Sequence, residues 1–436
     1  MKKRVLLIGY NFSPEPTGIG KYSGEMMHWL AKNGCDCSVI TTYPYYPYWQ
    51  VQAPYTNRKL WYTKEVEHFD SGGQISVFRC PMYVPAQPSC LKRILLDLSF
   101  LASAMGKLLH LLPGKKFDIV LVVAPSFQFG LLGVLYKLLR NATFVYHIQD
   151  LQIEAARDLG MIKSAKAINL LLRIEKFILS KADVVSSVSE SMVRKIQGKA
   201  NKDVLLLPNW SDLQQFFPIS DKAALKAEFG FAPTDKIVLY SGAIGAKQGL
   251  EAILYAAQEF GHQPDIKFVI CGSGPYKKTL QQLADALQLA NVIFFPLQPV
   301  SKFNAFLNVA DVHLVIQKAN ASDLVMPSKL TTILAIGGLA LITANENSGL
   351  HALVQKHEMG LLIPAENQAA LNQGIQQALE AEHHRITANA RAYAEKYLSL
   401  EKIMTTIEAA WTVSPALQPV DAPTMGLGEK QMEPSV

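Results

Sequence analysis

One pattern, repeated along the chain, limits its fold more than any other feature: a short apolar run, a glycine or proline break, and a helical segment. Nearly every residue of these runs is apolar, whereas a strand with one face in water alternates apolar and polar residues. Such runs are typical of parallel strands covered by helices on both faces, joined by right-handed crossovers. The sequence therefore predicts an α/β fold.

The pattern occurs in two series separated by a pause at residues 208–218, which suits a linker. The first series predicts strands at Arg4–Ile8, Ser38–Thr41, Ile75–Arg79, Phe117–Val123, Thr143–His147, Asp183–Ser187 and Val204–Leu207. The second predicts strands at Lys236–Tyr240, Lys267–Cys271, Val292–Phe295, Val312–Ile316, Leu339–Thr343 and Leu361–Ile363. We therefore expect two Rossmann-like domains, residues 1–207 and 219–397.

The C-terminal part of the chain changes character twice. Helical segments near Gln368–Leu379, His384–Tyr397 and Leu400–Trp411 follow the last expected strand, and residues 398–411 form a closing helix. Residues 412–436 are rich in proline and glycine with little periodicity, so we expect a disordered tail.

The N-terminus and the cysteines bear on the compartment. The apolar run after Met1 is only five residues long, too short for a signal-peptide core, which favours a cytoplasmic protein. The five cysteines are odd in number and include no Cys-x-x-Cys pair. They are therefore expected to be reduced thiols rather than disulfides or zinc ligands.

Charge divides unevenly along the chain. Residues 1–200 carry 25 Lys and Arg against 14 Asp and Glu, whereas residues 201–436 carry 17 against 22. A basic half suggests a partner with an anionic surface or an anionic substrate, although a merely solvated face is equally compatible. The basic residues are scattered and no binding motif occurs, so no nucleic-acid partner is expected.

The segment Leu91–Leu112 has an apolar stripe at helical spacing, bordered by lysine and arginine. Asp97 within it argues against a membrane-spanning helix. Two interpretations stay open: a buried domain helix, and a helix that lies on a membrane surface.

A glycine loop follows the first expected strand. Gly18 and Gly20 precede a helix that is expected to begin near Lys21. Glycine lets the backbone approach a ligand closely, and a helix N-terminus attracts an anion. The spacing is not that of the dinucleotide fingerprint, and a purely structural turn would also explain these glycines.

The second domain repeats this arrangement. Gly242 follows one strand and Lys247 comes just before the next helix, while Gly272 and Gly274 follow the neighbouring strand. Ser328 and Lys329 open a further helix, where lysine is unfavourable for the helix dipole unless an anion offsets it. Together these features predict a phosphate-rich ligand at the carboxyl edge of the sheet.

His147 ends an expected strand, a place where histidine can be structural or catalytic. No Asp-x-Asp, His-Glu-x-x-His or clustered His/Cys set occurs, so the sequence supports neither a metal site nor another cofactor.

These segments, in this order, resemble the retaining GT-B glycosyltransferases of family 4. The residues that carry the resemblance are Pro14–Tyr22, Tyr43–Pro47, Arg79–Pro85, His147–Asp150, Pro208–Ser211, Tyr240–Gly242, Lys247–Glu251, Phe294–Gln298 and Pro327–Thr331. It runs from residue 1 to about residue 411. It implies two Rossmann-like domains facing across a cleft, with the C-terminal helix returning to the first domain.

The resemblance also implies roles for individual residues. Lys247 would hold the donor diphosphate, Gly18 and Gly20 would face it from the other domain, and His147 would touch the donor sugar. Ser328, Lys329 and Leu330 match a segment that meets the nucleotide phosphates and ribose. Two positions depart from the family pattern: Thr332 replaces a glutamate, and Ala243 replaces a basic residue or asparagine.

By the same resemblance, fucose from GDP-fucose would pass to a lipid-linked oligosaccharide at the inner membrane surface, in colanic acid or other exopolysaccharide biosynthesis. The base and the sugar rest on resemblance alone. A nucleotide-sugar epimerase of GT-B-like fold and an inactive nucleotide-sugar-binding assembly partner remain as alternatives.

Overall fold

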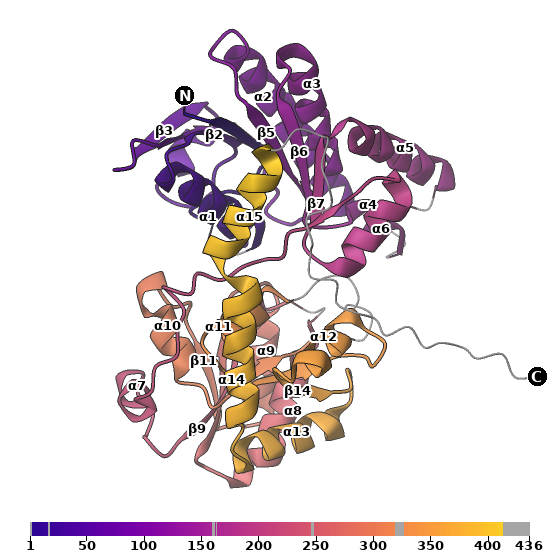
Figure 1. Ribbon diagram of the computed structural model, residues 1–436. Coiled ribbons are helices and arrows are strands. Elements are labelled where there is room, and N and C mark those ends of the chain that lie inside the picture. Colours follow the sequence, from indigo (N-terminus) through magenta and orange to yellow (C-terminus); the bar gives the residue numbers. More distant parts are fainter. Residues whose placement is uncertain are drawn as a thin grey trace, which may run out of the picture.

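The computed structural model describes residues 2–15, 18–158, 162, 164–245, 248–318 and 327–412. It contains an eight-stranded sheet followed along the chain by a six-stranded sheet, each with its helices (Figure 1). The predicted fold class, two Rossmann-like α/β domains, is confirmed.

The first sheet has the order β3-β4-β2-β1-β5-β6-β7-β8, with every neighbouring pair parallel except β3 and β4. Its strands are β1 (Arg4–Ile8), β2 (Asp36–Thr41), β3 (Thr63–His68), β4 (Gln74–Arg79), β5 (Ile119–Ala124), β6 (Thr143–Ile148), β7 (Val184–Ser187) and β8 (Leu205–Leu206). Its helices are α1 (Gly18–Lys32), α2 (Cys90–Leu111), α3 (Gly130–Arg140), α4 (Gln152–Asp158), α5 (Ala165–Lys181) and α6 (Glu190–Ala200). The direction of chain progress reverses between β1 and β5.

The second sheet has the order β11-β10-β9-β12-β13-β14 and is parallel throughout. Its strands are β9 (Lys236–Ser241), β10 (Ile266–Cys271), β11 (Val292–Phe295), β12 (Val312–Val315), β13 (Ala340–Thr343) and β14 (Leu361–Ile363). The helices are α7 (Lys222–Glu228), α8 (Glu251–Glu259), α9 (Lys277–Ala286), α10 (Val300–Asn308), α11 (Ser328–Ala335), α12 (Gly349–His357), α13 (Gln368–Glu380) and α14 (His384–Tyr393). Here the reversal lies between β9 and β12, the place where open α/β sheets bind ligands.

The last helix, α15 (Leu400–Thr412), leaves the second domain and packs on the first, as predicted (Figure 1). Its apolar side chains join the core around α1, and the indole of Trp29 donates a hydrogen bond to Glu401 at 2.7 Å. Just before it, Ser211 of the linker pairs with the chain near Ser399, so the two connections between the domains run side by side.

Two local features differ from the sequence expectations. Strand β3 was missed, because this edge strand is mostly polar and charged and gives no apolar run. Helix α1 begins at Gly18 rather than near Lys21, so both glycines lie in its first turn. The expected disordered tail lies outside the described residues, apart from Thr412, which ends α15.

Candidate functional site

The carboxyl edge of the first sheet holds the start of α1. Gly18 has a φ of 63°, a left-handed conformation that favours glycine, and open space surrounds the position of a Cβ. At Gly20, by contrast, a Cβ would lie 2.6 Å from a carboxylate oxygen of Glu15. Gly20 is therefore needed for a close approach inside the protein, while Gly18 presents its backbone outward.

Glu15 is a buried carboxyl of this edge to which the sequence analysis gave no role. It accepts hydrogen bonds from the backbone N–H groups of Tyr45 and Tyr46 and from the amide of Asn11. Burial raises the pKa of Glu15 to about 7. The one indication of a role available in the sequence was that Glu15 lies between the end of an expected strand and the glycines at positions 18 and 20.

His147 lies at the end of β6 and is almost fully buried. Its Nδ1 lies 3.0 Å from Ser186 Oγ, and its Nε2 lies 3.0 Å from the side-chain nitrogen of Gln149. Because that amide nitrogen can only donate, Nε2 accepts and Nδ1 carries the proton. Burial lowers the pKa of His147 to about 4, so the ring is neutral at pH 7. It can orient a ligand but supplies no positive charge.

In the second domain, the glycine loops after β9 and β10 pack directly on each other. A Cβ on Gly272 would lie 1.9 Å from the carbonyl oxygen of Gly242, and one on Gly274 would lie 2.0 Å from that of Ile244. The N–H of Ile244 also donates to the carbonyl of Ser273 at 2.9 Å. Packing of the two loops against each other therefore requires glycine at positions 272 and 274, whether or not a ligand is bound.

Lys329 provides the charge at this edge. Its Nζ lies 3.6 Å from the centre of the Tyr240 ring, and a Cβ on Gly242 would lie 2.9 Å from the same atom. Burial lowers the pKa of Lys329 to about 7, and no ion pair joins it to any residue that the structure describes. A cation in the first turn of a helix, without a carboxylate beside it, is suited to an anionic ligand.

The remaining predicted residues differ in placement. Ser328 is exposed at the start of α11, whereas the Leu330 side chain is in the core and its N–H donates to the carbonyl of Pro327. Only the backbone around Leu330 can therefore lie near a ligand. Thr332 is buried on the same helix. Lys247 lies outside the described residues, so the structure does not place it relative to the others.

The edges of the two domains meet through α1. The Tyr22 side chain lies beside Thr331 of α11, and Lys21 Nζ lies 6.0 Å from the centre of the Phe216 ring of the linker. The indole of Trp210, also in the linker, donates to Glu25 at 2.8 Å. These contacts bring the start of α1 close to the start of α11.

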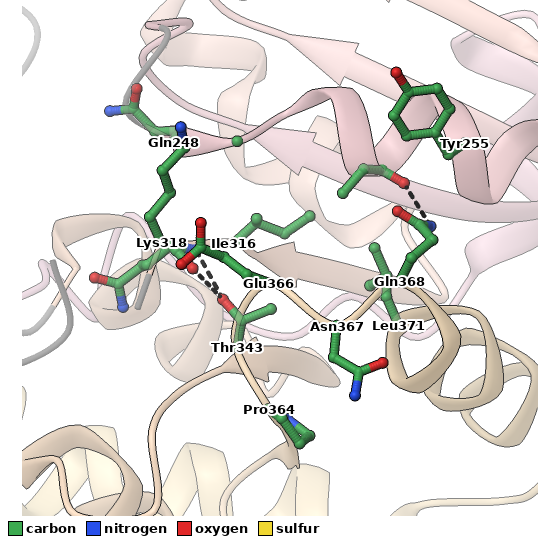
Figure 2. A pocket seen from close by; sticks show the side chains of 13 residues that line it. Gln248, Tyr255, Ile316, Lys318, Thr343, Pro364, Glu366, Asn367, Gln368 and Leu371 are labelled. Carbon is green, nitrogen blue, oxygen red and sulfur yellow. Dashed lines mark hydrogen bonds between the residues drawn. The ribbon is translucent and has the colours of Figure 1, made fainter. Parts of the chain in front are cut away.

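A cavity of about 200 Å³ lies beside Gln248 and Gly249, between α8 and the start of α13 (Figure 2). Its lining combines apolar side chains with uncharged polar groups, among them Gln248, Gln317 and Thr343. Gln248 Oε1 and Gln317 Nε2 are buried without a hydrogen-bond partner in the structure. No group of three or more potential metal-binding His, Cys, Asp and Glu side chains occurs in the described ranges.

The chain matches two family models. Residues 17–210 match the glycosyl transferase 4-like domain, and residues 221–396 match glycosyl transferases group 1. In structure it is similar to the sucrose-phosphate synthase of Thermosynechococcus elongatus, with TM-score 0.70, 17% identity and coverage of 94% of this chain and 98% of that one. It is also similar to HepE of Anabaena in complex with UDP and glucose, with TM-score 0.65, 14% identity and coverage of 94% and 99%.

The chain therefore belongs to the GT-B glycosyltransferases built from these two domains, and it is a glycosyltransferase. It is 41% identical over 409 residues to a protein of Escherichia coli (strain K12) described as a colanic acid biosynthesis glycosyl transferase, WcaI. That match covers 92% of this chain and 98% of WcaI.

Proposed function

We propose that this glycosyltransferase takes its sugar from a nucleotide-sugar donor bound mainly by the second domain. The observation that carries the proposal is the pair of packed glycine loops beside Lys329, whose ammonium has no carboxylate partner within the described residues. A diphosphate placed there would meet Lys329, the N–H groups at the start of α11, and Lys247 if that residue points as the family resemblance implies.

The donor we propose is GDP-fucose, and the acceptor a lipid-linked oligosaccharide of colanic acid or a related exopolysaccharide. The relationship with WcaI over nearly the full length of both chains supports this choice of pathway. HepE, whose fold is similar, was crystallised with UDP and glucose, which supports a nucleotide-sugar donor in general terms.

The proposed reaction retains the configuration at the sugar. Lys247, Lys329 and the helix N-terminus of α11 would stabilise the charge that develops on the leaving diphosphate. The acceptor hydroxyl would then add on the face that the diphosphate left. His147, neutral and held by Ser186 and Gln149, would orient the sugar; a sugar that bonds its Nε2 must displace the Gln149 amide. We propose that no metal takes part.

We further propose that the protein is cytoplasmic and peripheral at the inner face of the plasma membrane. Helix α2 buries one side against the core, but Leu91, Ile94, Leu95 and Leu98 are about half or more exposed. Its span Leu91–Leu111 is the one described helix that is long and apolar enough to cross a membrane. An outer apolar stripe beside lysine and arginine instead suits a helix lying on an anionic surface.

The first test is calorimetric titration of the purified protein with GDP and with UDP in the presence of a chelator, followed by a sugar-transfer assay with GDP-fucose. Lys247→Ala is expected to weaken nucleotide binding and to lower the rate by roughly 10²–10³-fold. Lys278→Ala, exposed on α9, is the matched control and should behave as the wild type.

Each outcome has a different consequence. Preference for UDP would remove GDP-fucose but keep a nucleotide-sugar transferase. Conversion of the donor without an acceptor would indicate an epimerase. Donor binding without turnover, with native lipid acceptor present, would indicate a binding partner. Full activity of Lys247→Ala would contradict the role of Lys247.

A further inference from the structure

Three segments of the first domain meet at the carboxyl group of Glu15. One is its own loop after β1, the second is the first turn of α1, and the third is the loop that follows β2. Glu15 is 4% exposed, so this contact lies beneath the surface of the candidate site rather than on it.

The groups that face the carboxylate oxygens are hydrogen-bond donors. The N–H groups of Tyr45 and Tyr46 lie 3.1 and 3.0 Å from Oε1, and the Asn11 amide nitrogen lies 2.8 Å from Oε2. An ionised carboxylate accepts all three, whereas a protonated one would turn an O–H toward a donor. These hydrogen bonds therefore favour the charged form of Glu15.

The first turn of α1 rests on the same carboxyl. A Cβ on Gly20 would lie 2.6 Å from Oε2 and 2.7 Å from the Cβ of Glu15, so only glycine allows this distance. The negative carboxylate also lies beneath the positive end of the helix, where it is favourable. Movement of Glu15 would thus move the turn that carries Gly18 and Gly20.

One cation contributes to the charge balance of Glu15. Arg79 of β4 lowers its pKa, but that guanidinium is bound to Glu65 and to the carbonyls of Thr42 and Ser13. Arg79 therefore does not form a direct ion pair with Glu15. Burial is the larger effect and raises the pKa of Glu15 to about 7.

The other titratable groups facing Glu15 are tyrosine hydroxyls. Glu15 contributes to raised pKa values at Tyr10, Tyr45 and Tyr46, which burial raises most. All three hydroxyls are consequently neutral throughout the range in which Glu15 titrates. The charge at this point of the edge thus depends on Glu15 itself.

We propose that Glu15 is a positioning residue for sugar transfer: its ionised carboxylate holds the first turn of α1 and the Tyr45–Tyr46 loop in the geometry that faces the second domain. The inference rests on the proposed function. Helix α1 transmits the effect, because Tyr22, four residues after Gly18, contacts Trp210 of the linker and Thr331 of α11. The direct partners of the Glu15 carboxyl, by contrast, all belong to the first domain.

The charge state gives this role a pH dependence. Protonation of Glu15 removes one of its acceptor positions and loosens its hold on the first turn of α1 and the Tyr45–Tyr46 loop. We therefore expect kcat to fall as the pH falls through about 7. Nucleotide binding by the second domain stays constant over the same range, because its contacts do not include Glu15. A split between kcat and nucleotide Kd is the signature of the proposal.

The experiment compares wild type, Glu15→Gln and the control Asp70→Asn, an exposed acid in the turn between β3 and β4. Initial rates with GDP-fucose and lipid-linked acceptor are measured from pH 5.5 to 8.5, and the Kd of GDP is measured by calorimetry. We expect Glu15→Gln to lower kcat at pH 8 by roughly 10- to 100-fold. We also expect it to lose the acidic limb, with the Kd of GDP unchanged.

Asn11→Ala is a second variant that tests the charge rather than the shape. Loss of one donor raises the pKa of Glu15 further, so the acidic limb of kcat moves to higher pH. A merely structural role would lower the rate equally at every pH. If Glu15→Gln fails to fold, this shift decides the question alone.

The proposal is overturned if Glu15→Gln keeps both the wild-type kcat and the acidic limb, or if the limb does not move in Asn11→Ala. A wild type that binds no nucleotide and transfers no sugar would count against the proposed function instead. In that case urea unfolding tests the buried carboxyl of Glu15 directly. Wild-type stability should fall as the pH rises from 4.5 to 7, and Glu15→Gln should remove this fall.

Discussion

The two sheet edges that form the candidate site are built differently. In the first domain, the buried ionisable groups have partners: Glu15 accepts three hydrogen bonds, and both ring nitrogens of His147 are occupied. In the second domain, Lys329 lies against the Tyr240 ring and has no carboxylate partner among the residues that the structure describes. The first edge is thus complete without a ligand, whereas the second has a cation that an anion would stabilise.

The glycines follow the same division. Gly272 and Gly274 are required because the two loops of the second domain press against each other, while Gly18 is required by its φ of 63° with open space around it. Gly272 is therefore sensitive to added volume and Gly18 to backbone conformation. Five predictions follow, from the largest expected effect to the smallest.

The largest expected effect is that of Lys329→Met, which removes the cation of the second edge. We expect kcat/KM to fall by roughly 10²–10³-fold, as on loss of one charge-stabilising group in a transition state. Lys278→Met on the exposed face of α9 is the control. Wild-type turnover in Lys329→Met would remove this residue from the site.

Lys329→Met should also change the stability of the protein, in the direction opposite to its effect on activity. The pKa of Lys329 is lowered to about 7 in the folded protein, so the unfolded chain binds more protons between pH 7 and 10.5. Wild-type stability consequently falls as the pH falls from 10.5 toward 7. Urea unfolding should show that Lys329→Met lacks this fall.

Gly272→Ala compared with Gly18→Ala measures the difference between the two kinds of glycine. We expect Gly272→Ala to cost about 3 kcal/mol of stability, because its Cβ would lie 1.9 Å from the Gly242 carbonyl oxygen. Gly18→Ala has room for its Cβ but adopts a left-handed φ, so about 1 kcal/mol is expected. Equal costs in urea unfolding would contradict the contrast.

His147 makes a pH-dependent contribution to the first edge. Because burial lowers its pKa from 6.5 to about 4, the unfolded chain takes up a proton first as the pH falls. The wild type should therefore lose about 3 kcal/mol through His147 between pH 6.5 and pH 4. The difference in urea midpoints between wild type and His147→Gln should shrink over this range; a constant difference would show that the ring titrates normally.

The smallest effect is expected where α15 joins the two domains. Trp29→Phe removes the 2.7 Å hydrogen bond to Glu401 but keeps most of the packing, and Glu401 remains in contact with solvent. About 1 kcal/mol should be lost. Thr406→Ala, exposed on the same helix, is the control. Thermal unfolding of the two variants separates them, and identical shifts would argue against a specific bond.

The sequence predicted the parallel strands well, because a buried strand must be apolar on both faces. Strands β1, β11 and β14 have the predicted bounds, and most others differ by one or two residues. Strand β3 gave no such signal, since it is an edge strand whose sequence is mostly polar and charged. Its position became visible only through its pairing with β4.

For the site, the sequence supplied the residue types but not their surroundings. Glycine loops and lysines after the strands indicated a phosphate-binding edge. The sequence could not show that Leu330 is a core residue, that His147 is neutral, or that Glu15 lies beneath Gly20. Each of these facts depends on contacts between segments far apart along the chain.

By itself, then, the sequence determined the two α/β units, their linker and the order of the motifs, because periodicity and local backbone requirements are properties of neighbouring residues. Only the tertiary structure decided which glycines are required by packing and which face outward, and which ionisable side chains have partners. Burial and pKa depend on everything that surrounds a side chain in space, and residues such as Glu15 and Tyr45 come together only when the chain folds.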